Sequence, residues 1–160
     1  MKIKEIIRPG GHKIFENNSM DEIVRLMSSS DEKTFCVVNK DNEVTGIISP
    51  KALIKLFIPG YFDLLENLNF IDNFGPLEKL FIEKLDFTIC CSAIVAKDIM
   101  FLDPITLDEN ASVLKAASIM VKNRIDFIPV LNSEKKYAGA LREKDIFKFI
   151  LNPEPLDKNG

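Results

Sequence analysis

An internal repeat constrains the fold of this chain more than any other feature of its sequence. When the sequence is compared with itself at an offset of 93 residues, without a gap, matching residues recur from residue 4 to residue 55. The matches include Lys4 with Lys97, Met27 with Met120, Val37 with Val130, Gly46 with Gly139, and Lys55 with Lys148. Self-similarity at one fixed offset is typical of a duplicated structural unit. We therefore expect two copies of one unit, at residues 1–58 and 94–152.

Each copy ends in a hairpin and a helix. In the second copy, residues 127–131 are an apolar β-type run, and a polar turn separates them from a second run at 137–141, which predicts a β-hairpin. Apolar residues then recur at helical spacing, so a helix is expected to begin near Arg142. In the first copy, Ser49 and Pro50 suit the N-cap and the first position of the corresponding helix.

Another helix precedes each hairpin. In the first copy it opens with Ser19, which is followed three residues later by Glu22, the spacing of a capping box. A short extended segment is expected before it, at residues 13–15 and again at 105–107. Each unit is therefore β-α-β-β-α, and the fold class is mixed α+β. Because about 58 residues bury only a modest core, we expect the two copies to pack sheet to sheet in pseudo-two-fold symmetry.

Two segments lie outside the repeat. Residues 59–93 form an insert whose apolar side chains recur at near-helical spacing, and we interpret it as a helical arm. Apolar helices need burial, so the arm packs either on the domain or against a second subunit. Residues 153–160 include two prolines, Pro153 and Pro155, and are expected to be a frayed C-terminal tail.

Composition restricts the partners. The 160-residue chain is 46% hydrophobic and 28% charged, which is typical of a globular protein. Its net charge of −3 argues against a nucleic-acid surface. No run of 18 apolar residues is present, so no membrane span is expected, and the first residues lack the apolar core of a signal peptide. We infer a cytoplasmic protein with neither nucleic acid nor membrane as partner.

No motif for catalysis or metal binding is present. The three cysteines, Cys36, Cys90 and Cys91, have no metal-ligand spacing and are expected to be reduced thiols. The single histidine, His12, has no Cys or His neighbour in the sequence. A nucleophile elbow, a phosphate-binding GxxxxGK[ST] loop and HExxH are all absent. We therefore expect no metal site and no enzymatic activity.

The second copy contains AKDIM, DPITL, FIPV and GALREKDI, and with these segments it resembles the cystathionine-beta-synthase (CBS) domain. The first copy is diverged and is related to the same family mainly through the repeat. Two such domains in tandem resemble a Bateman module of the stand-alone bacterial type. The resemblance implies two clefts between the copies, pairing as a homodimer, and binding of adenosyl ligands such as AMP, ADP, ATP or S-adenosylmethionine.

The family's ligand-binding pattern is Gly, two apolar residues, Ser or Thr, two further residues, and Asp. In the family, the Asp holds the ribose hydroxyls and the Ser or Thr lies near the phosphate. The second copy, GALREKD, keeps the ribose anchor as Asp145 but has Arg142 in place of the hydroxyl. The first copy, GIISPKA, keeps Ser49 but has Ala52 in place of the Asp.

The candidate site follows from this carry-over. Arg142 either pairs with a phosphate bidentately or is an ordinary solvent-facing arginine. Lys144, and its counterpart Lys51 in the first copy, lie in helix first turns, where free N–H groups favour phosphate. The base pocket would be lined by Ile105, Thr106, Ile128, Pro129 and Val130. These five residues are equally compatible with a role as ordinary strand-core residues.

Two functions remain open. The first is a regulatory module that senses an adenosyl ligand, without a tightly bound cofactor, and signals to a separate effector protein or through a homodimer. The second is an assembly module whose clefts bind nothing, because each copy departs from the ligand pattern at one position.

Overall fold

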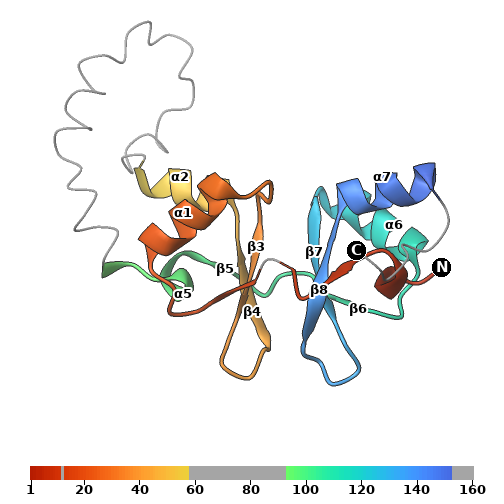
Figure 1. Ribbon diagram of the computed structural model, residues 1–160, viewed down its shortest axis with the longest axis horizontal. Coiled ribbons are helices and arrows are strands. Elements are labelled where there is room, and N and C mark those ends of the chain that lie inside the picture. Colours follow the sequence, from red (N-terminus) through yellow and green to blue (C-terminus); the bar gives the residue numbers. More distant parts are fainter. Residues whose placement is uncertain (12, 58–92, 153–160) are drawn as a thin grey trace, which may run out of the picture.

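The computed structural model describes residues 1–11, 13–57 and 93–152. The expected helical arm, apart from residue 93, lies outside the described residues, as do His12, Cys90, Cys91 and the tail at 153–160. Figure 1 shows two similar halves side by side, with the strands β3, β4, β7 and β8 in the middle and the longer helices on the outside. The mixed α+β fold with sheet-to-sheet packing is confirmed.

Each copy contains the predicted order of elements along the chain. The first comprises η1 (Ile3–Glu5), β1 (Arg8–Pro9), β2 (Lys13–Phe15), α1 (Met20–Ser29), β3 (Phe35–Val38), β4 (Val44–Ile48) and α2 (Pro50–Phe57). The second comprises α5 (Ala96–Ile99), β5 (Phe101–Leu102), β6 (Leu107–Asp108), α6 (Val113–Asn123), β7 (Phe127–Leu131), β8 (Tyr137–Arg142) and α7 (Glu143–Leu151). The extended segment expected at 105–107 begins later, at Leu107, where parallel pairing with Val130 starts. Ile105 and Thr106 therefore precede the strand.

The helix before each hairpin begins at the same position of the repeat. The Oγ of Ser19 accepts a hydrogen bond from the Glu22 N–H at 3.3 Å, and the Glu22 carboxylate accepts one from the Ser19 N–H at 2.9 Å. This is the predicted capping box, which satisfies two free N–H groups of the first turn. In the second half, Ser112 caps α6 by accepting a hydrogen bond from the Lys115 N–H at 3.1 Å. The duplicated sequence thus fixes both helix starts.

The leading segments of the two copies are exchanged. One sheet has the strand order β1-β8-β7-β6 and the other has β2-β3-β4-β5. Strand β1 of the first copy is therefore the edge of the second copy's sheet, where Arg8 pairs antiparallel with Ala140. Strand β5 of the second copy is likewise the edge of the first copy's sheet, where Phe101 pairs with Ile47. Neither sheet is complete without a strand from the other copy.

The hydrophobic cores follow the same exchange. The core of the second half includes three buried isoleucines from the first copy, Ile3, Ile6 and Ile7. The core of the first half includes Ala96 from the second copy. Separating the two copies would expose these side chains, and burial of apolar surface contributes about 25 cal/mol per Å² to stability. The two copies therefore form one folding unit.

A third cluster lies between the two sheets. It contains the buried residues Cys36, Val38, Phe127, Tyr137 and Ala140. At its edge, the backbone carbonyl of Asn42 accepts a hydrogen bond from the Tyr137 N–H at 2.9 Å, and the Asn42 side-chain amide donates to the Tyr137 carbonyl at 3.0 Å. These contacts fix the register of one sheet against the other. Throughout the described part of the chain, every helix is too short or too polar to cross a bilayer.

Candidate ligand site between the two copies

Arg142 and Asp145 form a closed pair at the start of α7. The Arg142 Nε donates to Asp145 Oδ2 at 2.7 Å, and its Nη2 donates to Oδ1 at 2.7 Å. The Arg142 backbone N–H also donates to Oδ2, at 3.1 Å. The Asp145 side chain is only 4% exposed. A bidentate guanidinium therefore neutralises this buried carboxylate. Arg142 is thus not an ordinary solvent-facing arginine, which was one of the two alternatives that the sequence left open.

The first copy contributes Glu32 to the same place. Glu32 lies between α1 and β3, and its carboxylate accepts hydrogen bonds from Arg142 Nη1 and, at 3.0 Å, from Lys144 Nζ. Its side chain is 7% exposed, and that of Arg142 is 11% exposed. We call Glu32, Arg142, Lys144 and Asp145 the ionic cluster. The cluster joins the two copies with two acidic and two basic groups.

Glu32 carried no sequence signal, because its counterpart at the 93-residue offset is the apolar Ile125. The start of α7 also differs from the predicted phosphate cradle. The Glu143 N–H donates to the Asp126 carbonyl at 3.2 Å, and the Arg142 N–H is bonded to Asp145. Two backbone donors at this helix start are thus already engaged.

Two cavities lie beside the ionic cluster. One, of about 210 Å³, is lined by residues from both copies, among them Thr34, Asp126 and Phe127. The other, of about 260 Å³, is lined by Arg8, Ser30, Asp31, Glu32, Arg142, Lys144 and Lys148. Four of its seven lining residues are cationic and two are acidic. This second cavity, which we call the basic cavity, therefore favours an anion.

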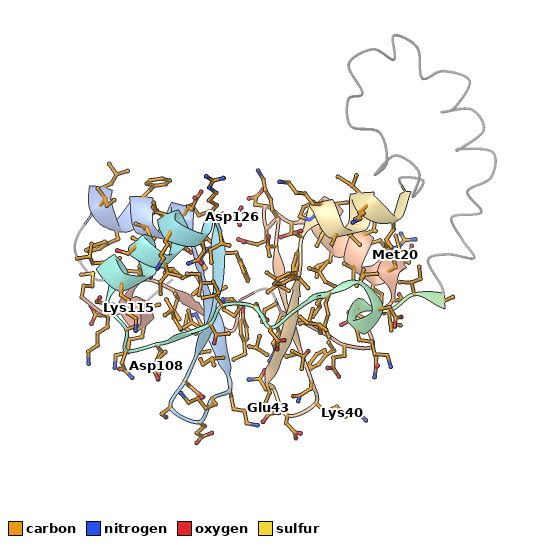
Figure 2. All side chains as sticks on the ribbon, turned by 180° about the vertical axis from the view of Figure 1, so that it is seen from behind. Met20, Lys40, Glu43, Asp108, Lys115 and Asp126 are labelled. Carbon is orange, nitrogen blue, oxygen red and sulfur yellow. The ribbon has the colours of Figure 1, made fainter. Side chains whose placement is uncertain are left out.

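A larger cavity, of about 590 Å³, is also lined by residues of both copies. It is lined by Glu43, Val44, Thr45, Asp103, Pro104, Thr106, Leu131 and Lys135. Figure 2 shows Glu43 at the opposite end of the interface from Asp126, which lines a cavity at the ionic cluster. We expected Thr106 and Asp145 to belong to one site, and the structure does not bring these two residues together. The exchange is the reason, because the segment after β5 lies against the first copy's sheet.

The place that corresponds to this cavity in the repeat, around Tyr137 and Gly11, is closed. At the 93-residue offset, Val44 corresponds to Tyr137, and Pro104 corresponds to Gly11. The Tyr137 hydroxyl donates to the Gly11 carbonyl at 2.6 Å, and burial raises the Tyr137 pKa. The space between Gly11 and Arg142 measures only about 10 Å³. The space around Gly11 is thus filled by Tyr137 and the Arg142–Glu32 pair, and the open space at this end lies in the two cavities beside the ionic cluster.

A sequence profile of the CBS domain matches residues 3–58 and again residues 96–152. The chain belongs to the CBS-domain family. An uncharacterized protein of Methanocaldococcus jannaschii is 25% identical over 166 residues, which cover 94% of this chain and 92% of the relative.

Solved CBS pairs have the same fold. The CBS-pair protein CBSX2 of Arabidopsis thaliana, in complex with AMP, has a TM-score of 0.69 at 17% identity and covers 95% of this chain and 97% of its own. The CBS domain pair of protein MJ0100, in complex with 5′-methylthioadenosine and S-adenosyl-L-methionine, has a TM-score of 0.65 at 17% identity, covering 94% and 99%. The tandem CBS pair predicted from the sequence is confirmed.

The other candidate residues lie apart from the ionic cluster. Ile128, Pro129 and Val130 of the second CBS repeat are fully buried in β7 and line none of the cavities described above. Ile105 is partly exposed ahead of β6. In the first CBS repeat, Ser49 is half-buried before α2, and Lys51 is exposed on its first turn. The structure thus gathers Arg142, Lys144 and Asp145 at one place and leaves the other candidates elsewhere.

Proposed function

We propose that this CBS pair is a regulatory module that binds an adenosyl ligand such as AMP, ADP, ATP or S-adenosylmethionine at Asp145 of the second repeat. The observation that carries the proposal is the buried Asp145 carboxylate, which lies at the junction of the repeats beside the basic cavity. A carboxylate can accept hydrogen bonds from both hydroxyls of a ribose. CBS pairs of the same fold in complex with AMP and with S-adenosyl-L-methionine support the ligand class.

Binding at this place would alter the contacts between the repeats. The Asp145 oxygens become available to a ribose only when Arg142 leaves them, and Arg142 is also bonded to Glu32 of the first repeat. A ligand that occupies Asp145 therefore favours an arrangement in which the inter-repeat ion pair is remade. A ligand with different affinity for two arrangements shifts the population between them. The signal then passes to an effector protein or to a second copy of the chain.

The test is calorimetric titration of AMP, ADP, ATP and S-adenosylmethionine into the wild type and into Asp145→Asn. The substitution keeps the size of the side chain but weakens its hydrogen bonds to the ribose, so affinity should fall by roughly 1.5–3 kcal/mol. Asp108→Asn is the matched control, because Asp108 is an exposed carboxylate of the same repeat. Equal affinities of Asp145→Asn and the control would contradict the assignment of Asp145.

A second function, assembly without a ligand, is favoured by two observations. Arg142 already occupies both Asp145 oxygens, and α6 and α7 carry exposed apolar side chains. The most exposed of these include Leu114, Val121, Phe147 and Ile150. We propose a homodimer through this helical face, because apolar patches commonly mark protein interfaces. Three results together would favour assembly over sensing. The wild type would be a dimer, the Leu114→Asp/Val121→Asp protein would be a monomer, and titration with any of the four ligands would release no heat.

A further inference from the structure

We propose that Arg142 makes the second-repeat site selective for adenosyl ligands that carry a phosphate. Arg142 acts as an internal cation that pairs with Asp145 until the phosphate of a ligand binds the guanidinium in place of this carboxylate. The inference rests on the proposed function and names the ligand class of the same site. It concerns the residue by which this chain departs from its family's pattern, since the hydroxyl of a Ser or Thr would leave Asp145 open.

The charges of the ionic cluster set the cost of opening the site. Glu32 and Asp145 balance Arg142 and Lys144, and three of these four side chains are at most 11% exposed. An uncharged nucleoside that displaced Arg142 from Asp145 would supply hydroxyl donors to the carboxylate and nothing to the guanidinium. Arg142 would keep its bond to Glu32 but lose its two bonds to Asp145, and a buried charge that loses one of its partners is destabilised. A phosphate removes this cost, because it offers the guanidinium bidentate acceptor oxygens.

The basic cavity lies where such a phosphate would be received. Arg142 shares this cavity with Arg8, Lys144 and Lys148. Lys144 and Lys148 are four residues apart on α7 and so lie on the same face of the helix. Arg8 reaches the cavity from the exchanged strand β1. At about 260 Å³ the cavity is smaller than whole-ligand pockets, which measure roughly 300–1,000 Å³, and suits the phosphate end alone.

The positive charge belongs to the second-repeat site and not to the duplicated unit. At the 93-residue offset, Arg8 corresponds to Phe101, and Arg142 corresponds to Ser49. Only the two lysines have basic counterparts, Lys51 and Lys55. The first-repeat side therefore lacks both guanidinium groups. We expect the selectivity for phosphate to be confined to the side that contains Asp145.

The experiment compares adenosine, 5′-methylthioadenosine and AMP, which differ at the 5′ position, by calorimetric titration into the wild type and into Arg142→Ser. In the wild type, AMP should bind at least about tenfold more tightly than the two uncharged nucleosides, the difference that one charge-assisted contact of about 1.4 kcal/mol produces. In Arg142→Ser, both nucleosides should gain affinity because Asp145 is open, and the preference for AMP should fall to about threefold or less. The same preference in both proteins would overturn the inference.

A second variant keeps the test independent of the folding of Arg142→Ser. Arg8→Ala/Lys148→Ala alters two exposed residues of the basic cavity and leaves Arg142 on Asp145. This double variant should lose affinity for AMP by about tenfold and keep its affinity for adenosine. An equal loss for both ligands would contradict the inference. Equal binding of adenosine and AMP to the wild type would overturn the selectivity alone, whereas no binding of any adenosyl ligand by any variant would overturn the proposed function itself.

Discussion

Gly139 lies directly against the backbone carbonyl of Arg8. A Cβ atom at Gly139 would be 2.6 Å from the Arg8 oxygen, closer than real Cβ contacts come. In the other half, a Cβ at Gly46 would be 2.9 Å from the Phe101 oxygen. Each glycine of the duplicated motif therefore leaves room for the edge strand that the other copy contributes. This relationship explains why the repeat places glycine at both positions.

We expect Gly139→Ala to destabilise the protein by about 1–3 kcal/mol, since a forced overlap in a packed region typically costs this much. The clashing atom is backbone, so β1 must move away from β8 to relieve the contact. Gly11→Ala is the control, because a Cβ there would meet its nearest atom at 3.7 Å, an ordinary contact distance. Urea denaturation measures both variants. Equal free energies of unfolding would show that β1 does not constrain Gly139.

The ion pair between the copies should contribute to stability. Glu32→Gln removes the charge that faces Arg142 and Lys144, and we expect the free energy of unfolding to fall by about 1–3 kcal/mol because a buried charge loses a partner. Asp21→Asn is the control, since the Asp21–Arg25 pair is exposed and surface pairs contribute little. Denaturation by urea, which is uncharged, avoids screening of the pairs. A loss in Glu32→Gln no larger than in the control would contradict the role assigned to the cluster.

Stability should also decrease at alkaline pH. Burial raises the pKa of Cys36 from 9.0 to about 12, with a smaller opposing effect of Lys13. Above pH 9 the unfolded chain releases this proton while the folded protein retains it, so the free energy of unfolding should fall as the pH rises from about 9 towards 12. The raised pKa of Tyr137 acts in the same direction.

Urea denaturation at pH 8, 9 and 10 measures this dependence. Cys36→Ala and Tyr137→Phe each remove one titrating group, so each variant should have a flatter pH profile than the wild type, whatever its stability at pH 8. Profiles parallel to that of the wild type would show that neither buried group titrates differently in the folded and unfolded states.

The order of helices and strands along the chain was predictable from the sequence. The exchange of the leading segments between the two copies was not. The capping box at Ser19 and the helix start near Arg142 depend on neighbouring residues, and the structure places α7 one residue later, at Glu143. Ile3, Ile6 and Ile7 are apolar whichever copy's core they join. Their sequence therefore holds no information about which sheet β1 completes.

The candidate site, too, could be predicted only in part from the sequence. The family's ligand-binding pattern drew attention to Arg142 and Asp145, which the structure joins directly. Thr106 was assigned to the same pocket because it belongs to the same copy, and the exchange places it beside Thr45 of the other copy. Glu32 was missed because its contact with Arg142 spans 110 residues and has no counterpart in the repeat.

Ala52→Asp should add a binding site in the first repeat. This substitution restores the carboxylate of the family pattern, and the first repeat has Ser49 in place of the competing Arg142. We expect calorimetric titration with AMP to show two ligands per chain for Ala52→Asp and one for the wild type. Ala52→Asn, which has the same size and no charge, is the control, and one ligand per chain in all three proteins would contradict the prediction.

The central claim is that Asp145 holds the ribose of an adenosyl ligand after Arg142 has left it. A crystal structure of the protein with AMP tests it most directly. The account predicts both ribose hydroxyl oxygens at about 2.5–3.0 Å from the Asp145 carboxylate, with the Arg142 guanidinium on the phosphate in the basic cavity. AMP bound only in the cavity between Thr45 and Thr106, with Arg142 still paired to Asp145, would contradict it.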